Sequence, residues 1–160
     1  MSTQYIFKSP LGPISLVASE KGLQGVYLDK QKNIPSVRDL QGSDKSVRQL
    51  KKVALQLTEY FAGRRKQFSL DFDIQGTDFQ RKVWNELSRI PYGQVCSYSD
   101  IAKKIKNPKA VRAVGSANGK NPLCIIVPCH RVIAADGTLG GYSGGLKVKS
   151  QLLKLEKVSL

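Results

Sequence analysis

The spacing of apolar residues changes near residue 75, and this change constrains the fold more than any other feature of the sequence. Before it, short β-favouring runs at 5–7, 14–18 and 23–28 alternate with Pro- and Gly-containing turns. One helical stripe follows and ends at Gly63; it consists of Val47, Leu50, Ala54, Leu57 and Phe61. These patterns predict a small α/β domain over residues 1–75.

Helical signals dominate from residue 76 onward. Thr77 and Gln80 have the spacing of a capping box, and apolar residues follow at positions 79, 83, 87 and 90. Residues 97–100 offer a second helix start, with a short helix over 101–105. Asn107 and Pro108 offer a third, for a helix that runs to about residue 118. Two short helices joined by a tight turn in a basic region are typical of a helix-turn-helix. We therefore expect a second, mostly α-helical domain over residues 76–160.

The chain is strongly basic. Its 160 residues include 26 Lys and Arg against 12 Asp and Glu, a formal net charge of +14. Residues 1–75 hold 12 basic and 7 acidic side chains and residues 76–160 hold 14 and 5, so the second half carries +9. Such an excess is typical of proteins that bind nucleic acid, although a generally basic protein is the simpler alternative. We expect a polyanion to bind the second half.

The sequence favours a protein that works away from membranes. No apolar run is long enough to span a bilayer, and residues 1–10 lack the basic-then-apolar layout of a secretory signal. We expect a cytoplasmic protein, associated with the nucleoid if the source is a prokaryote.

Cysteine and histidine are few. Cys96, Cys124 and Cys129 are an odd number without the spacing of a disulfide scaffold, and His130 is the only histidine. The C-x₂-C spacing of a closed zinc site is missing, and residues 1–95 contain neither residue type. We therefore expect no bound metal.

Residues 125–131, Ile-Ile-Val-Pro-Cys-His-Arg, carry the strongest chemical signal. The β-branched run predicts a short buried strand that ends at Pro128, so that Cys129 and His130 fall at a strand exit. A thiol is a useful nucleophile only when ionised, and neighbouring imidazole or guanidinium groups favour ionisation. A histidine base also needs an acceptor for its other ring nitrogen. The acids available after residue 75 are Asp78, Glu86, Asp100, Asp136 and Glu156.

The alternative for Cys129 is a structural role. Buried cysteines commonly act as small apolar residues of a core. Adjacent residues on a regular strand also point to opposite faces, so that a contact between Cys129 and His130 would require a turn or a bridging water. The residues alone leave both interpretations open.

The third predicted helix is built from small residues. They are Ala110, Ala113, Gly115, Ser116 and Ala117, with Arg112 as the one long side chain among them. Small side chains permit either a close approach to DNA, with Arg112 as a probe, or tight helix packing inside the protein, and this segment favours neither.

A wider resemblance emerges around the cysteine. Residues 128–131, Pro-Cys-His-Arg, with Ile-Ile-Val before them and Val-Ile after, closely resemble the signature of the O6-alkylguanine-DNA alkyltransferases, or methylated-DNA–protein-cysteine methyltransferases. Stretches at 92–95, 97–98, 107–115, 121–122 and 141–145 follow the order and spacing of that family. The specific similarity covers about residues 77–156, while residues 1–75 match only in length and in their strand-then-helix character.

The resemblance implies a fold and a reaction. The fold is a ribonuclease-H-like α/β domain followed by a mostly α winged-helix-like domain, whose helix-turn-helix binds the minor groove of double-stranded DNA. The reaction is direct-reversal repair, in which O6-alkylguanine, together with O4-alkylthymine, is flipped out of the duplex and its alkyl group passes irreversibly to Cys129 in a single turnover. The alkyl group comes from the DNA, so no cofactor is expected. The resemblance further implies a monomer.

The resemblance also implies site roles. Cys129 would accept the alkyl group, His130 would act as a base through a water, and Glu156 would orient that histidine. Tyr98 would rotate the nucleotide and protonate the leaving guanine, and Asn121 would hold the hinge between recognition helix and active-site strand. The implied DNA-binding residues are Tyr98, Ala110, Val111, Arg112, Gly115, Ser116 and Arg131. Among them, Arg112 would fill the gap that the flipped base leaves in the stack. The implied pocket residues are Val132, Tyr142, Ser143 and Cys124.

Two departures from the family matter. Cys124 stands where some members carry proline, which predicts either a changed tolerance for bulky alkyl groups or a passive small apolar residue. The first domain lacks the Cys and His ligands that some members use for zinc, so no zinc site is carried over.

Two other classes of function compete with the alkyltransferase. A binding protein, either a lesion sensor without repair activity or a helix-turn-helix regulator, is expected to lack the thiol, and Cys129 is present. A cysteine hydrolase would need a second histidine or another water-activating group to free the enzyme, and the sole imidazole is already committed. The sequence therefore favours the alkyltransferase.

Overall fold

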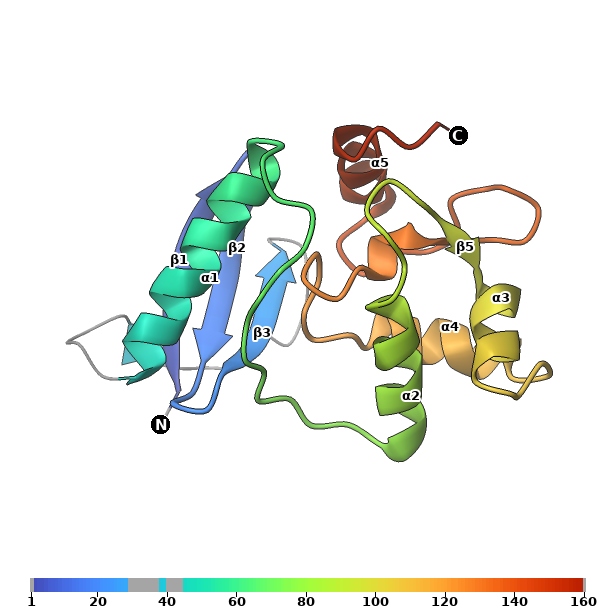
Figure 1. The fold of residues 1–160 in the computed structure, drawn as a ribbon, viewed down its shortest axis with the longest axis horizontal. Coiled ribbons are helices and arrows are strands. Elements are labelled where there is room, and N and C mark those ends of the chain that lie inside the picture. Colours follow the sequence, from blue (N-terminus) through green and yellow to red (C-terminus); the bar gives the residue numbers. More distant parts are fainter. Residues whose placement is uncertain (1, 29–37, 40–44, 160) are drawn as a thin grey trace. The chain divides into compact units, whose positions relative to one another are not determined.

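The computed structural model describes residues 2–28, 38–39 and 45–159. The chain forms two compact units that meet between Gln75 and Gly76. The first unit contains a sheet and one helix, and the second is mostly helical (Figure 1). Among the described residues, no helix has the length and apolar character needed to cross a membrane.

The first unit is a four-stranded sheet with the order β3-β2-β1-β4. β1 (Thr3–Ser9), β2 (Gly12–Ala18) and β3 (Leu23–Leu28) are antiparallel neighbours, whereas β4 (Arg38–Asp39) runs parallel to β1. The three predicted strand runs are thus confirmed as β1, β2 and β3. Turn-forming residues separate them because tight reversals need backbone conformations that glycine adopts without strain, as Gly12 does at φ +103°.

Helix α1 (Lys45–Phe61) covers one face of this sheet (Figure 1). Its apolar stripe faces the strands, and its buried apolar side chains are Val47, Leu50, Val53, Leu57 and Tyr60. The helix ends where the sequence predicted, because Gly63 takes φ +76° and the amide of Arg64 bonds back to the carbonyl of Glu59.

The second unit begins with two capped helices. Helix α2 (Asp78–Leu87) starts at Thr77, whose hydroxyl accepts from the amide of Gln80 while the Gln80 side chain accepts from the amide of Thr77. Helix α3 (Tyr98–Lys104) starts at Ser97 with the same reciprocal bonds to Asp100. Both predicted starts are confirmed, because a capping box satisfies two orphan amides with side chains that are close in sequence.

Helix α4 (Val111–Gly119) begins later than predicted. Asn107 does not cap it; instead, the carbonyl of Asn107 accepts from the amide of Ala110, which closes a turn before the helix. Ala110 is the N-cap and makes no side-chain capping bond. α4 packs against α2 and α3, so α3 and α4 form the expected pair of short helices joined by a tight connection.

The strand predicted over residues 125–127 is absent. Two short-range bonds coil this segment into turns instead, from the amide of Ile126 to the carbonyl of Cys124 and from the amide of Val127 to that of Leu123. Ile125 takes φ +74° within this coil. Cys129 therefore opens the 3₁₀ helix η1 (Cys129–Arg131) rather than leaving a strand.

Two short strands and one helix complete the unit. Strand β6 (Val132–Ile133) follows η1 directly and pairs in parallel with β5 (Cys96–Ser97). A loop then leads to helix α5 (Leu146–Leu155), which packs against η1. The helix η1, which begins with Cys129, thus contacts both α5 and α2.

Candidate active site

Cys129 is buried, with 1% of its surface exposed. A hydrogen bond with the neighbouring Cys124 thiol, followed by burial, raises the pKa of Cys129 well above its ordinary value. The Asn121 amide and the charge of Lys149 act in the opposite direction. The resting group is therefore a neutral thiol, and any reaction that uses its thiolate must include a step that removes the proton.

His130 and Glu156 form a fully buried pair. The Nε2 atom of His130 lies 2.7 Å from Oε2 of Glu156, and both side chains are 0% exposed. Because a carboxylate only accepts, Nε2 carries the hydrogen and Nδ1 has a free lone pair. Nδ1 has no hydrogen-bond partner in the described structure. Burial lowers the pKa of His130, against the opposing effect of Glu156, so the ring is neutral at pH 7.

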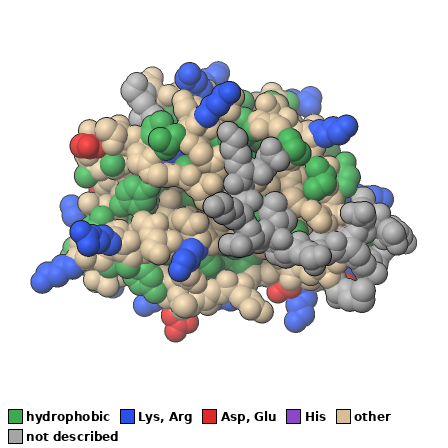
Figure 2. Space-filling view, turned by 180° about the vertical axis from the view of Figure 1, so that it is seen from behind, with side chains coloured by type: hydrophobic (Ala, Val, Ile, Leu, Met, Phe, Trp, Pro, Cys, Tyr) green, Lys and Arg blue, Asp and Glu red, His purple; other side chains and the backbone are tan. Residues whose placement is uncertain are grey.

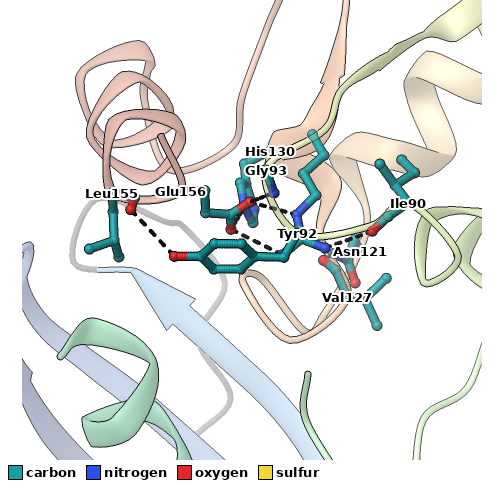
Figure 3. Close-up of polar contacts among 9 residues, drawn as sticks. Ile90, Tyr92, Gly93, Asn121, Val127, His130, Leu155 and Glu156 are labelled. Atoms are coloured by element: carbon teal, nitrogen blue, oxygen red, sulfur yellow. Dashed lines mark hydrogen bonds and ion pairs between the residues drawn. The ribbon is translucent and has the colours of Figure 1, made fainter. Parts of the chain in front are cut away.

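The Glu156 carboxylate is held on several sides (Figure 3). Arg131 donates from Nε to Oε1 over 2.8 Å and from Nη2 to Oε2 over 3.1 Å, and the amide of Gly93 donates to Oε1 over 3.3 Å. Such bonds offset the cost of removing a carboxylate from water. The carboxylate is thus fixed in the orientation that receives His130.

Arg131, which the resemblance placed among the DNA-binding residues, lies buried in the second unit and is held by protein groups. It is only 5% exposed, and its remaining Nη1 donates to the carbonyl of Ile90 over 2.7 Å. Its guanidinium pairs with Glu156 inside the unit, so that a contact of Arg131 with DNA stays a prediction of the resemblance.

The 3₁₀ geometry of η1 decides how Cys129 and His130 relate. Successive residues of a 3₁₀ helix are about 120° apart around the axis, so the two side chains leave in different directions without lying on opposite faces. No direct hydrogen bond joins them in the described structure, and Nδ1 of His130 remains unpartnered. A water that bridges two polar groups is a common way to close such a gap.

Asn121 ties the coil before the cysteine together. Its Nδ2 donates to the carbonyl of Val127 over 2.8 Å, and its Oδ1 accepts from the amide of Leu123 over 3.0 Å. Asn121 is buried, so these bonds are shielded from water. The residue expected at the hinge between α4 and the cysteine segment therefore fixes the shape of that segment.

A cavity of about 470 Å³ opens in the second unit. Its lining residues come from α3, α4 and the loop before α5, and they are Tyr98, Gly115, Asn118, Gly119, Gly141, Tyr142 and Ser143. The expected pocket residues Tyr142 and Ser143 are among them, and the thiol of Cys124 lies 3.8 Å from Oγ of Ser143. Val132 is fully buried and does not line the cavity.

Tyr98 stands at the wall of the cavity. Its hydroxyl donates to the carbonyl of Gly141 over 3.5 Å. Burial, followed by the negative charge of an ionised Cys129, raises the pKa of Tyr98. The phenol therefore keeps its proton and can act as a donor within the cavity.

The outer face of α4 carries the other expected DNA-binding residues. Val111, Arg112 and Ser116 are exposed, and Ala110 and Gly115 are half-buried. Val114, Ala117 and Asn118 are buried and point into the unit. The small residues of α4 thus allow close packing on one side of the helix and leave its other side exposed to solvent. Figure 2 shows one face of the molecule, on which Lys and Arg side chains outnumber those of Asp and Glu.

Two residues near Cys129 were not among those expected from the sequence. Nδ2 of Asn118 donates to the carbonyl of Cys129 over 3.5 Å, and no sequence pattern pointed to it. Lys149 is fully buried beside Cys129. Its position was detectable, because Lys149 is three and four residues before Leu152 and Leu153 and so falls on the apolar face of α5.

A helix pair of the helix-turn-helix type joined to a buried thiol and a histidine–carboxylate pair defines a class: two-domain proteins that combine a DNA-binding fold with cysteine chemistry. Two sequence profiles of one family match the chain, the 6-O-methylguanine DNA methyltransferase ribonuclease-like domain at residues 3–74 and the DNA binding domain at residues 78–158. The chain therefore belongs to the 6-O-methylguanine DNA methyltransferase family. The expected fold class, a ribonuclease-like α/β domain followed by a helical DNA-binding domain, is confirmed.

Individual relatives agree over nearly the whole chain. A methylated-DNA–protein-cysteine methyltransferase of Methanosarcina acetivorans is 50% identical over 151 residues, which are 94% of this chain and 96% of the relative. The inducible methyltransferase of the same description from Bacillus subtilis is 44% identical over 96% of this chain and 83% of its own. The crystal structure of Mycobacterium tuberculosis OGT in complex with DNA has a TM-score of 0.87 at 42% identity, covering 98% of this chain and 92% of that one.

Proposed function

We propose that this protein is a DNA alkyltransferase that repairs O6-alkylguanine in double-stranded DNA by moving the alkyl group to its own Cys129. The observation that carries the proposal is the buried thiol beside a histidine whose Nε2 is bound by Glu156 and whose Nδ1 is unpartnered. The naming of close relatives as methylated-DNA–protein-cysteine methyltransferases supports the same activity.

The first step is removal of the thiol proton. Nδ1 of His130 accepts the proton of Cys129 through one bridging water, and the Glu156 carboxylate stabilises the imidazolium that forms. This step is needed because the neighbouring Cys124 and burial raise the pKa of Cys129. The neutral imidazole needed as a base is present because burial lowers the pKa of His130.

The second step is an in-line displacement at the alkyl carbon. The thiolate forms the S–C bond, the C–O6 bond breaks, and its electron pair goes to the guanine. Tyr98 donates its phenolic proton to the guanine, which then leaves as a neutral base. The product is a thioether that hydrolysis does not reverse, so each molecule reacts once.

The base must first leave the duplex, which costs about a few kcal/mol. We infer that the exposed face of α4 enters the minor groove with Ala110, Val111, Gly115 and Ser116 close to the backbone, and that Arg112 fills the space of the extruded base. The cavity lined by Tyr98, Tyr142 and Ser143, with Cys124 behind Ser143, then receives the O6-alkylguanine or an O4-alkylthymine. Asn121 holds the connection between α4 and the cysteine segment. A monomer suffices for this chemistry, and the substrate places the protein at the cell's DNA.

Intact mass spectrometry tests the proposal. The protein is incubated with a duplex that carries one O6-methylguanine, and peptides are then mapped. We expect a gain of one methyl group on Cys129, saturating at one per molecule, and no gain in a Cys129→Ala variant that still binds the duplex. Methyl groups on Cys96 or Cys124 would overturn the assignment of the acceptor, and binding without any mass gain would favour a lesion sensor.

A further inference from the structure

A cavity of about 330 Å³ lies between α2 and the C-terminal end of α3 and shares no lining residue with the cavity at Tyr98. Four cationic side chains line it. They are Lys82 in α2, Arg89 just after α2, Lys104 at the end of α3 and Lys106 just after α3, and all four are exposed. Glu86 is the one carboxylate among the lining residues, so four positive charges and one negative charge give this cavity a formal charge of +3.

The single carboxylate is already engaged. Oε1 of Glu86 accepts from Nη1 of Arg89 over 2.6 Å, so these two charges compensate each other. Among the described residues, no carboxylate lies within ion-pair distance of Lys82, Lys104 or Lys106. Like charges that line one cavity repel each other, and an anion between them replaces this repulsion with attraction. The three lysines, called here the lysine cluster, therefore form a site with the right charge for an anion.

Helix stabilisation is the competing explanation for the lysine cluster. A lysine in the last turn of a helix interacts favourably with the helix dipole, and Lys104 has that position in α3. The dipole does not account for Lys82, which lies in the middle of α2, more than one turn from either end. Helix stability thus explains Lys104 and leaves Lys82 unexplained.

Lys106 occupies a backbone position that favours glycine. Its φ is +60°, in the left-handed region, and the amide of Asn107 bonds back to the carbonyl of Ala102 over 2.9 Å. This arrangement closes α3, and glycine is the usual residue at such a position because it has no Cβ atom. The backbone thus disfavours a lysine here, so the benefit of Lys106 has to come from its side chain, which lines the cavity.

The cavity adjoins the turn that leads into α4. Lys106 lies in the connection between α3 and Val111, the first residue of α4. In a helix-turn-helix, the second helix enters a groove of DNA while the first helix crosses the sugar–phosphate backbone. Phosphodiester groups are therefore the anions that come closest to the end of α3 when α4 is on DNA.

We propose that the cavity between α2 and α3 is a phosphate-binding site, in which Lys82, Lys104 and Lys106 hold one phosphodiester group of the duplex that α4 enters. This inference rests on the proposed function and adds a contact to it. The ammonium groups donate to the unesterified phosphate oxygens, and Arg89 contributes less because Glu86 already compensates its charge. Such a contact positions the duplex and carries no sequence information.

The salt dependence of DNA binding tests the site. Fluorescence anisotropy measures binding of an unmodified labelled duplex at several NaCl concentrations, for the wild type and for Lys82→Gln/Lys104→Gln/Lys106→Gly. Each neutralised phosphate contributes about −0.9 to the slope of log K against log [NaCl]. We expect the triple variant to lose about one such contribution and to bind about tenfold less tightly at about 0.1 M NaCl.

A matched control removes the same amount of charge elsewhere. Arg48→Gln/Lys51→Gln/Lys52→Gln takes three exposed positive charges from α1 in the first unit and should keep the slope of the wild type. Single-turnover transfer from a duplex with one O6-methylguanine gives a second measurement. In the lysine-cluster variant, the half-saturating protein concentration should rise about tenfold while the maximal rate constant changes by less than about twofold. This difference separates a binding contact from damage to the reactive site.

Lys106→Gly alone separates binding from folding. Glycine adopts the backbone conformation of position 106 without strain, so the midpoint of urea unfolding should equal or exceed that of the wild type. The affinity for the duplex and the magnitude of the salt slope should nevertheless fall. A folding defect would then be excluded as the cause of weaker binding.

Several outcomes would overturn the inference. An unchanged salt slope for the triple variant is one, and an equal loss in the α1 control is another, because it would show a general effect of net charge. Energy transfer between donor-labelled and acceptor-labelled duplexes on one protein would place the phosphate on a second duplex. By contrast, the expected slopes together with no methyl transfer by the wild type would refute the proposed repair reaction and support the phosphate site.

Discussion

Arg131 and Glu156 form a buried bidentate ion pair, in which one guanidinium donates to both carboxylate oxygens. Oε2 of Glu156 also lies 2.7 Å from Nε2 of His130. The Arg131 guanidinium lies over the Tyr92 ring, 5.7 Å from its centroid. Glu156 therefore keeps its charge inside the unit and is able to orient His130. Arg131 is thereby tied to the site through Glu156.

Replacement of Arg131 should cost stability and leave DNA affinity intact. Arg131→Met leaves an uncompensated buried carboxylate, so we expect the free energy of unfolding to fall by about 3–5 kcal/mol. Trp84, the only tryptophan, lies in the second unit and reports its unfolding in urea. The exposed Arg112→Ala should change stability by less than about 0.5 kcal/mol and weaken binding to an unmodified duplex. If folded Arg131→Met, or the milder Arg131→Lys, loses as much affinity as Arg112→Ala, Arg131 contacts DNA after all.

Removal of the Cys124 thiol should make Cys129 more acidic. The hydrogen bond with Cys124 is the largest influence that raises the pKa of Cys129, so Cys124→Ala should shift the ionisation of Cys129 to lower pH. Alkylation by iodoacetamide, followed residue by residue with mass spectrometry across pH, measures this shift. Cys96→Ala is the control, because burial holds the pKa of Cys96 at about 11 independently of this site. Identical profiles for Cys124→Ala and wild type would contradict the prediction.

His130 should make the protein less stable in acid. Burial lowers its pKa below the ordinary 6.5, so below pH 6.5 the unfolded chain binds a proton that the folded chain refuses. The effect of His130 on the free energy of unfolding is therefore absent well above pH 6.5. It destabilises the protein increasingly as the pH falls from 6.5 toward the pKa of His130 in the folded state. Urea unfolding between pH 7.5 and 5 should show a steeper loss of stability for the wild type than for His130→Gln. Parallel curves would show that His130 is not buried in its neutral form.

The two capping boxes offer a matched pair of variants. Ser97→Ala and Thr77→Ala each remove a hydroxyl that accepts from a helix amide, and each should cost about 1 kcal/mol. Only Ser97 caps the helix whose first residue is Tyr98. We therefore expect Ser97→Ala alone to slow methyl transfer in single-turnover assays. Equal effects on transfer would mean that the rate follows stability rather than the position of Tyr98.

Arg112 should matter only when the base has to leave a duplex. We expect Arg112→Ala to slow transfer from O6-methylguanine in double-stranded DNA by about tenfold or more, because the extruded state loses its support. Transfer from free O6-alkylguanine base should change little, because no stack has to be opened. Equal slowing with both substrates would remove this role from Arg112.

Local patterns predicted much of the fold. The three strand runs, the stripe of α1 and both capping boxes depend on residues within a few positions of each other, and the structure contains all of them. The start of α4 was predicted too early, because Asn107 and Pro108 suit a turn as well as a helix start, and the turn is what forms.

The errors near the cysteine have a different cause. Ile-Ile-Val has a strong preference for strands, but the buried side chain of Asn121 holds the segment in a coil through two bonds that no local pattern reveals. The burial of Arg131 and Lys149 likewise depends on partners far along the chain, Glu156 and the carbonyls of the loop at 139–141. The sequence indicated which residue types gather at the site and could not indicate which of them face inward.

The φ of +74° at Ile125 has an energetic meaning. A β-branched residue in the left-handed region is strained, typically by about 1–3 kcal/mol, and a glycine there would remove that strain. Ile125 is 1% exposed, so its packing in the core offsets the cost. The backbone that leads to Cys129 is thus held in a strained conformation by the packing of the core around Ile125. Mutations that loosen the core near Ile125 are then expected to affect the reaction from a distance. They would let the backbone relax and move the sulfur of Cys129, although every reactive side chain is still present.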